Sequence, residues 1–314
     1  MGKIIVAGSI AYDHIMDFPG YFKDQIIPEK IDELNISFLV NSLKKVKGGT
    51  APNIAYSLAL IGQKPEVLGT VGSDFEDYRR WLESKGVGTS LIRVKEDDFT
   101  ASCFINTDLS NHQIIGFYPG AMAYDMQISM LDIPMDDVSI VVVAPTEPAA
   151  MVKWCDELRK MGVPYLYDCG MQIPRMAADE LVQGVMGARI AIFNEYEYDM
   201  MLKKTELTAE EILNKVEMIV VTLGEKGSVL QTRTEKIRVP AARPDQVVDP
   251  TGAGDAYRAG LLKGYLEGAG PEQMGKYASI TAVYAVEHKG ATEHSYTIDE
   301  FYNRYKDNFG GLKE

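Results

Sequence analysis

The residues most able to do chemistry form a glycine-rich turn with a carboxylate at each end, Asp249-Pro250-Thr251-Gly252-Ala253-Gly254-Asp255. Val247 and Val248 before the turn are predicted to end a strand, and the residues after it follow helical spacing. Glycines at such a corner let backbone N–H groups converge on a ligand, and a helix N-terminus adds partial positive charge. The turn is therefore predicted to be an anion site, in which the Gly252–Gly254 amides hold a phosphoryl group.

Asp255 adds a proton acceptor to this turn. A carboxylate in the first turn of a helix is stabilised by the helix dipole, so we expect the pKa of Asp255 to be low. A weak base suffices for phosphoryl transfer, because the attacking hydroxyl loses its proton late. We expect Asp255 to accept that proton, and Asp249 to shape the entry to the turn or to bind a cation behind it. The alternative for Asp255 is an ordinary acidic residue capping a helix.

Two common nucleotide-binding patterns are missing from the sequence. No G-x-x-x-x-G-K-[ST] occurs, and the turn after the first predicted strand, Gly8-Ser9-Ile10-Ala11, lacks the G-x-G-x-x-G of dinucleotide binders. A nicotinamide dehydrogenase is therefore a remote alternative.

Composition narrows the class of protein. A formal net charge of −13 over 314 residues argues against binding to nucleic acid polymers, whereas backbone amides can still hold small phosphorylated ligands. The three cysteines, Cys103, Cys155 and Cys169, have no CxxC spacing, which favours a reducing compartment over a disulfide framework or a zinc site. The N-terminus has no signal-peptide layout, and the longest strongly apolar run, 140–144, is too short to span a bilayer. These features predict a soluble cytoplasmic protein with no membrane partner.

Apolar runs and helical patterns alternate along most of the chain. Capping boxes are predicted to open helices at Ser73, Thr208 and Thr297, and Gly86 is placed to end the first of them. This alternation predicts an α/β fold with a mostly parallel, Rossmann-like sheet flanked by helices. The predicted buried strands are Ile4–Ala7, Val67–Gly69, Ile140–Ala144, Tyr165–Tyr167, Ile190–Phe193 and Ile219–Thr222.

Two regions without a convincing helix interrupt this alternation. Residues 12–47 and 100–119 carry β-leaning stretches at 36–40, 103–105 and 114–118. Two long loops in one domain would be unusual, so we expect a small β-rich lid inserted into the fold rather than surface loops. The predicted catalytic core is then made of residues 1–11, 48–99 and 120–314.

Five ordered motifs together resemble those of the ribokinase-like family of carbohydrate and purine kinases. Any one of them is a weak signal, but their order and spacing are highly specific and cover nearly the whole chain. The motifs are Gly48-Gly49-Thr50-Ala51-Pro52-Asn53, Gly69-Thr70-Val71-Gly72-Ser73-Asp74, Asn194-Glu195-Tyr196-Glu197, Thr222-Leu223-Gly224-Glu225-Lys226-Gly227 and Asp249-Pro250-Thr251-Gly252-Ala253-Gly254-Asp255-Ala256.

The resemblance implies ATP-dependent phosphorylation of a hydroxymethyl group, in a Rossmann-like core covered by a β-sheet lid. It implies that Asp255 is the catalytic base and that Gly252, Ala253 and Gly254 form an anion hole. Asn194 and Glu197 would act through water on Mg²⁺, and a monovalent cation is a further possible cofactor. Taken alone, Asn194 to Glu197 would instead be a charged helix start. The implied ATP-site residues are Asn194, Glu197, Thr222, Gly224, Gly227 and Thr251.

The resemblance extends to the substrate. Asp13, Gly48, Gly49 and Asn53 would bind the vicinal hydroxyls of a sugar ring. Residues 9–20, 34–40 and 117–122, together with Arg258, are similar to the bacterial adenosine kinases of this family. This implies that adenosine is phosphorylated to AMP. The implied contacts are Phe117 stacked on the base, Ser9 and Asp13 on the ribose, and Ser37 and Gln172 at polar edges.

Several alternatives stay open at the level of sequence. Cys103 stands where a second aromatic wall is expected, unless the register places Phe104 there, and Phe38 fits lid packing as well as stacking. Ser37 lies in a lid segment that a second subunit could supply, which implies a homodimer. The rival functions are a ribokinase-type sugar kinase of the same family and, remotely, a catalytically silent ligand-binding relative.

Overall fold

The central element of the structure, a computed structural model that describes residues 2–311, is a nine-stranded sheet. Its strand order is β13-β12-β11-β10-β9-β8-β1-β4-β5, and every neighbouring pair from β11 to β5 is parallel. β12 and β13 extend it as antiparallel strands. The bounds are β1 (Lys3–Ala7), β4 (Pro65–Gly72), β5 (Gly88–Lys95), β8 (Val138–Val143), β9 (Tyr165–Asp168), β10 (Ile190–Asn194), β11 (Met218–Thr222), β12 (Ser228–Gln231) and β13 (Lys236–Val239).

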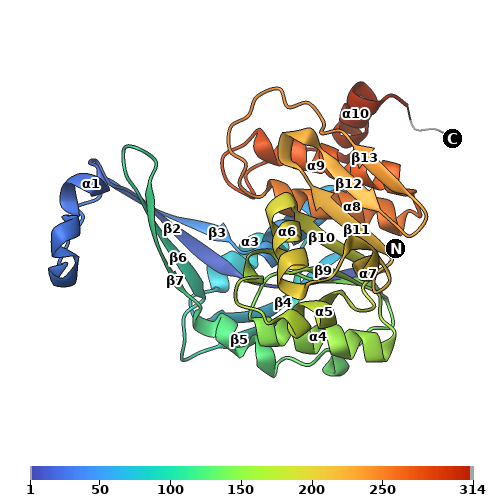
Figure 1. The fold of residues 1–314 in the computed structure, drawn as a ribbon, viewed down its shortest axis with the longest axis horizontal. Coiled ribbons are helices and arrows are strands. Elements are labelled where there is room, and N and C mark those ends of the chain that lie inside the picture. The colour runs from blue at the N-terminus through green and yellow to red at the C-terminus, as the bar shows by residue number, and fades with distance from the viewer. Residues whose placement is uncertain (1, 312–314) are drawn as a thin grey trace.

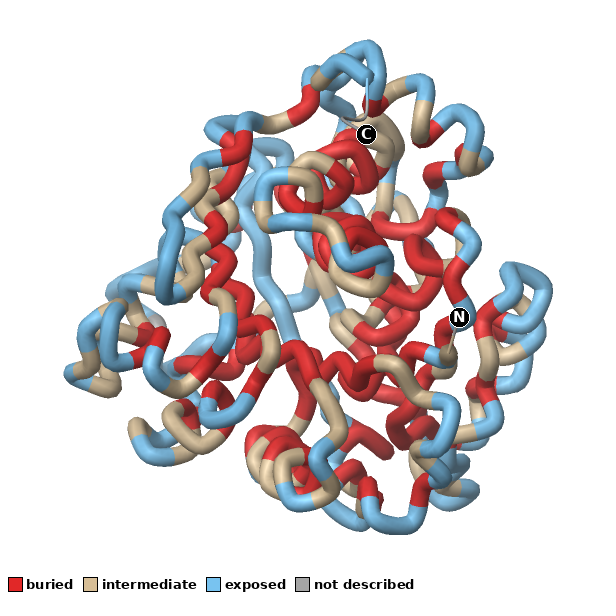
Figure 2. The backbone as a smooth tube through the Cα atoms, turned by 90° about the vertical axis from the view of Figure 1, so that its right-hand side faces the viewer, coloured by how far each residue is buried: buried red, intermediate tan, exposed pale blue. Residues whose placement is uncertain are grey.

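Helices cover both faces of this sheet (Figure 1). Alternate residues of β1 point to opposite faces, so Ile4 and Val6 pack in one apolar cluster while Ile5 and Ala7 pack in the other. Figure 2 shows the buried segments gathered in the middle of the molecule. One face carries α2 (Thr50–Leu60), α3 (Glu76–Ser84), α8 (Ala253–Leu266), α9 (Pro271–Val286) and α10 (Ile298–Phe309). The other carries α4 (Pro148–Met161), α5 (Ala178–Val185), α6 (Glu195–Thr205) and α7 (Ala209–Leu213).

A second, four-stranded sheet projects from one end of this core (Figure 1). Its order is β3-β2-β6-β7, with β2 and β6 parallel and the other two pairs antiparallel. We call it the lid sheet. Its strands are β2 (Ala11–Asp17), β3 (Ser42–Gly48), β6 (Ala101–Thr107) and β7 (Gln113–Tyr118), and α1 (Phe22–Gln25) and the 3-10 turn η1 (Pro28–Glu33) lie between β2 and β3.

The six predicted buried strands are all confirmed, as β1, β4, β8, β9, β10 and β11. The mostly parallel sheet with flanking helices and a small second sheet confirms the predicted fold class. Thr208 and Thr297 cap α7 and α10 with the expected capping boxes, and Gly86 follows α3 with a φ of 78°. Local patterns therefore located most of the core correctly.

Three local predictions are wrong. Helix α3 begins only after Phe75, without a side-chain cap, because Ser73 and Asp74 bond to the 98–100 segment instead. The stretch 36–40 is not a strand; the neighbouring lid strand is β3. Val247 and Val248 are not a strand either, and the two residues are 70% and 48% exposed. The Val248 amide bonds to the Val286 carbonyl at the end of α9, so the glycine turn follows an irregular segment docked on a helix.

Candidate active site

The glycine turn forms the N-terminus of helix α8, and Thr251 and Gly254 in it are exposed to solvent. Gly252 caps α8 with a φ of 80°, and a Cβ atom there would lie 2.6 Å from the Ala291 Cα atom. Asp249 accepts the amides of Thr251 and Gly290, both at 2.9 Å. Burial opposes the charge of Asp249, but these hydrogen bonds outweigh it and lower its pKa. Asp249 therefore shapes the turn, as expected, and fixes it to the loop after α9.

Asp255 is the third residue of this helix, in its first turn, and is partly buried. The Asn53 side-chain amide donates to Asp255 Oδ2 at 2.9 Å. Burial raises the pKa of Asp255 to about 6, with a smaller contribution from Asp168, although Arg258 and Asn53 oppose the shift. The expectation of a low pKa is therefore wrong, because the helix dipole contributes only about 0.3–1 kcal/mol and burial of the carboxyl outweighs it. Asp255 is consequently a stronger base near neutral pH than an exposed carboxylate.

Asp168, which the sequence patterns did not single out, forms a buried ion pair beside Asp255. Arg258 Nε lies 2.5 Å from Asp168 Oδ2, and the Asp168 side chain is 1% exposed. Asp168 is the last residue of β9, next to a predicted strand. Polar residues at the carboxyl ends of parallel strands are where α/β folds bind ligands. This general rule could have identified Asp168 from the sequence, because it directly follows the predicted strand Tyr165–Tyr167.

The residues expected to bind a sugar lie around Asp255 and Asn53. The Ser9 hydroxyl accepts the Thr50 amide at 3.2 Å, and Gly49 has a φ of 96° with no room for a Cβ atom against the Ser9 carbonyl. A Cβ atom on Gly48 would lie 2.6 Å from Asp13 Oδ2, so this glycine leaves space for the carboxylate. Burial raises the pKa of Asp13. The structure thus brings the first and last sequence motifs together.

The lid register determines whether Cys103 or Phe104 shares a face with Asp13. Asp13 pairs with Cys103, and Cys103 pairs with Phe117, so these three side chains share one face of the lid sheet. Phe104 lies on the opposite face, stacked on His14 with ring centroids 4.6 Å apart. Cys103, and not Phe104, therefore shares the face of Asp13 and Phe117. Phe117 is 52% exposed, so its ring is free to meet a ligand.

Two other predicted substrate residues have different surroundings. Ser37 is exposed in the irregular segment before β3, and the neighbouring Phe38 packs against Phe18 and Phe22 with centroids 5.0 and 5.1 Å apart. Phe38 thus fills the outer part of the lid. Gln172 is buried after β9 and accepts a hydrogen bond from Arg175 at 3.1 Å. A polar contact of Ser37 or Gln172 with substrate stays a prediction.

The expected ATP-site residues follow the carboxyl ends of β10 and β11. Asn194 and Glu197 form a capping box at the start of α6, with both hydrogen bonds at 2.8 Å. Burial raises the pKa of Glu197, the Asn194 amide lowers it, and Asp168 adds a smaller upward shift. The Thr222 hydroxyl donates to the Phe193 carbonyl at 3.4 Å. Gly224 begins the turn η5 (Gly224–Lys226) and Gly227 follows it, with φ values of 60° and 89°. Thr251 is exposed in the glycine turn.

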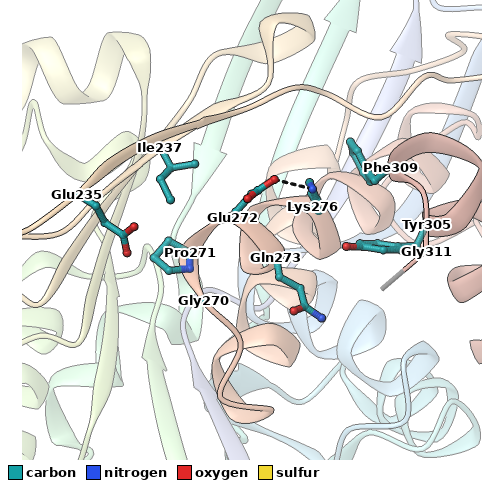
Figure 3. A pocket seen from close by; sticks show the side chains of 10 residues that line it. All are labelled: Glu235, Ile237, Gly270, Pro271, Glu272, Gln273, Lys276, Tyr305, Phe309 and Gly311. Carbon is teal, nitrogen blue, oxygen red and sulfur yellow. Dashed lines mark ion pairs between the residues drawn. The ribbon is translucent and has the colours of Figure 1, made fainter. Parts of the chain in front are cut away.

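A pocket at the other end of the core is separate from this site (Figure 3). Helix α8 leads away from the glycine turn, and α9 returns beside it, so their junction lies about 20 Å from the turn. The pocket lies at that junction, lined by Pro271, Gln273, Lys276 and Phe309 among others. It therefore has no part in the chemistry of Asp255.

The chemistry of the site defines its class. An open glycine turn at a helix N-terminus can bind an anion, and a partly buried carboxylate beside it can take a proton from a hydroxyl. The fold and this site together are those of a phosphotransferase that acts on hydroxyl groups of small molecules. The chain belongs to the pfkB family of carbohydrate kinases, whose family model matches residues 3–298.

Among the described residues, no helix is long and apolar enough to cross a membrane.

Nucleoside kinases are among the most similar proteins. The chain is 31% identical to a nucleoside kinase of Methanocaldococcus jannaschii over 306 residues, with 97% of each chain covered. A structure of Burkholderia thailandensis nucleoside kinase in complex with inosine is 33% identical, covers 98% of both chains and superposes with a TM-score of 0.87. A deoxyribokinase of Salmonella typhi is 26% identical, with 82% of this chain and 87% of the relative covered. The protein is thus a nucleoside or sugar kinase of this family that uses ATP.

Proposed function

We propose that this enzyme phosphorylates the 5′-hydroxyl of a purine ribonucleoside, with adenosine as the expected substrate and Asp255 as the base. The hydrogen bond from Asn53 to Asp255 carries the proposal, because it joins the predicted sugar-binding motif to the catalytic turn. A ribose whose hydroxyls bind Asp13 and Asn53 would present its hydroxymethyl group to Asp255. The amides of Gly252, Ala253 and Gly254 would then stabilise the transferring phosphoryl group.

The ATP side is proposed to use the motifs at β10 and β11, with Mg²⁺ bound mainly by phosphates and water. The described residues contain no cluster of three His, Cys, Asp or Glu side chains suited to a metal. Glu197 keeps one carboxylate oxygen, Oε1, outside its capping bond with Asn194. Such a donor set fits an ion that retains several waters and needs few direct protein ligands. When bound, the ion would neutralise charge developing on the phosphates.

The lid sheet is proposed to bind the base. The face shared by Asp13, Cys103 and Phe117 offers one exposed aromatic ring and, opposite it, a small thiol. An aromatic ring provides a flat apolar surface on which a purine can stack. Strand β7 is exposed along its whole length and carries Ile114 and Ile115. We therefore also propose that a second copy of the chain covers the lid sheet.

A substrate panel tests the proposed function. ADP release should be measured with adenosine, inosine, guanosine, cytidine, ribose, fructose and fructose 6-phosphate. We expect purine ribonucleosides to have the highest kcat/KM, because only they can fill both the sugar site and the aromatic face. A free sugar with the higher kcat/KM would instead establish the ribokinase-type alternative. Comparing kcat/KM for adenosine and inosine then shows whether the site prefers an exocyclic amine or a carbonyl at the edge of the base.

Phe117 and Phe104 offer a matched pair of substitutions on opposite faces of the lid. We expect Phe117→Ala to raise the KM for the nucleoside about 5- to 100-fold, since stacking on an aromatic ring contributes about 1–3 kcal/mol. Phe104→Ala removes a similarly exposed ring that contacts His14, so its KM should change less than about threefold. Equal effects of the two substitutions on KM would contradict base stacking on Phe117.

A further inference from the structure

One guanidinium lies among three carboxyl groups beside the catalytic turn. Arg258 pairs with Asp168 at 2.5 Å and is 9% exposed. Burial of Arg258 opposes its charge, but Asp168, Asp255 and Glu197 outweigh this effect and raise its pKa. A buried charge needs compensation, and here a single arginine compensates an acidic cluster. Its loss would leave the carboxylates to repel one another.

The position of Arg258 links this cluster to the anion site. It follows Asp255 by three residues on α8, so the two side chains lie on the same side of the helix. Arg258 Nη1 lies 2.9 Å from the position that a Cβ atom on Gly254 would take. Asp168 forms its ion pair with the guanidinium at Nε. Asp168 Oδ1 accepts no hydrogen bond among the described residues, so Arg258 is the principal group that compensates this carboxylate.

We propose that Arg258, held in place by Asp168, is a positioning residue that keeps Asp255 ionised, and that this ion pair sets the pH range in which the kinase works. The proposal rests on the proposed role of Asp255 as base. It adds that the charge of Asp255 is controlled by two residues that lie in none of the five sequence motifs. Asp168 is on β9, and Arg258 follows the last motif by two positions. Neither Arg258 nor Asp168 needs to touch the substrate for this function.

The charged groups that face Asp255 determine in which direction each substitution shifts its pKa. Asn53 reaches Asp255 from α2 and Arg258 from α8, and Asp168 faces it from β9. Tyr78 of α3 is in electrostatic reach of both Asp255 and Asp13. Glu197 of α6 acts on Arg258 and Asp168. The base must be deprotonated to act, so kcat/KM should fall as the pH drops below the Asp255 pKa of about 6. Removing Arg258 should raise that pKa, and removing the charge of Asp168 should lower it.

The experiment compares pH profiles of kcat/KM, from about pH 5 to 9, for the wild type, Arg258→Met, Arg258→Lys, Asp168→Asn and the double variant. Loss of an adjacent opposite charge shifts a carboxyl pKa by about one unit or more, so Arg258→Met should lose about fivefold or more at pH 6 and regain most of that loss at pH 8.5. Asp168→Asn should move the acid limb to lower pH. Arg258→Lys and the double variant should lie closest to the wild type, because they restore the charge balance.

Control variants distinguish an electrostatic effect of Arg258 and Asp168 on Asp255 from a role in packing alone. Arg159→Met removes an arginine that pairs with Asp156 at 2.8 Å on α4, a helix that leaves the site and ends at the opposite edge of the sheet. It should leave the acid limb unchanged. If Arg258→Met does not fold, the opposite shift in Asp168→Asn and its reversal in the double variant still test the proposal. A pH-independent loss in all Arg258 and Asp168 variants would overturn it.

A direct titration keeps this proposal distinct from the proposed function. The pKa of Asp255 can be measured by NMR of ¹³C-labelled aspartate in the wild type and in the double, Asp168→Asn and Arg258→Met variants, without substrate. The same opposite shifts are expected there. If no nucleoside or sugar is phosphorylated but the shifts appear, the proposed function fails while the ion pair retains its effect on Asp255. Activity without any shift would overturn only the proposal for Arg258 and Asp168.

Discussion

Replacing Asp255 with Asn is expected to lower kcat about 10²–10⁴-fold, the usual contribution of a general base. Asn has the same shape and can still accept the hydrogen bond that Asn53 donates at 2.9 Å, so the KM for the nucleoside should change little. What it cannot do is take the proton of the attacking hydroxyl. The loss should therefore appear in single-turnover phosphoryl transfer as well as in steady-state kcat.

The same substitution should stabilise the fold at high pH. The pKa of Asp255 is about 6 in the folded protein and lies near 4 in an unfolded chain, so the ionised carboxyl opposes folding above pH 6. Asp255→Asn removes this cost. A pKa difference of about two units between the folded and unfolded states corresponds to at most about 3 kcal/mol. Because both states are protonated below about pH 4, the gain in Tm should be full near pH 8 and fade as the pH falls from 6 to 4.

Asp249→Asn is the matched control at the other end of the turn. The pKa of Asp249 is lowered by the hydrogen bonds from Thr251 and Gly290, so its charge favours folding. This stabilisation is present above the unfolded-state pKa and is lost as the pH falls through the folded-state pKa. Asp249→Asn should therefore lower Tm near pH 8, where Asp255→Asn raises it. An Asp255→Asn enzyme that kept more than about a tenth of kcat would contradict its assignment as the base.

The sequence predicted those features of the site that depend on local patterns. Gly252 and Gly49 occur where the backbone takes a positive φ, and Asn53 and Asp255 stand in motifs whose meeting follows from the fold of the family. Apolar runs predicted the core strands because a parallel sheet buries both faces. The irregular path of Val247 and Val248 was missed because two β-branched residues are also compatible with an exposed segment docked on α9.

Features that depend on distant contacts could not be predicted in this way. The pKa of Asp255 is set by its burial and by Asp168, which lies far away in sequence on β9, and no local rule joins the two. The choice between Cys103 and Phe104 depends on strand register, since a shift by one residue exchanges the faces of the lid sheet. Arg258 was noted only as a family resemblance, and its partner Asp168 gave it a physical function.

Replacing Gly252 with Ala is expected to lower kcat about 10²–10³-fold, the cost of misplacing a donor in an anion hole. Gly252 has a φ of 80°, a conformation that costs a non-glycine residue about 1–3 kcal/mol. Its Cβ atom would also lie 2.6 Å from both the Cα and the Cβ atoms of Ala291, and backbone contacts of this kind cannot be relieved by a side-chain rotation. The turn must move, and the amides that follow it move with it.

Gly268→Ala separates the cost of backbone strain from the loss of the anion site. Gly268 has a φ of 71° after the far end of α8, and a Cβ atom there would meet nothing within 4 Å. This variant should lose about 1 kcal/mol of stability and keep the wild-type kcat. Gly252→Ala should lose more in Tm and, in addition, bind ATP and nucleoside with little change while transferring the phosphoryl group slowly. If Gly252→Ala lowered Tm but kept kcat within about threefold, the turn would be a structural helix start and not the anion hole of this kinase.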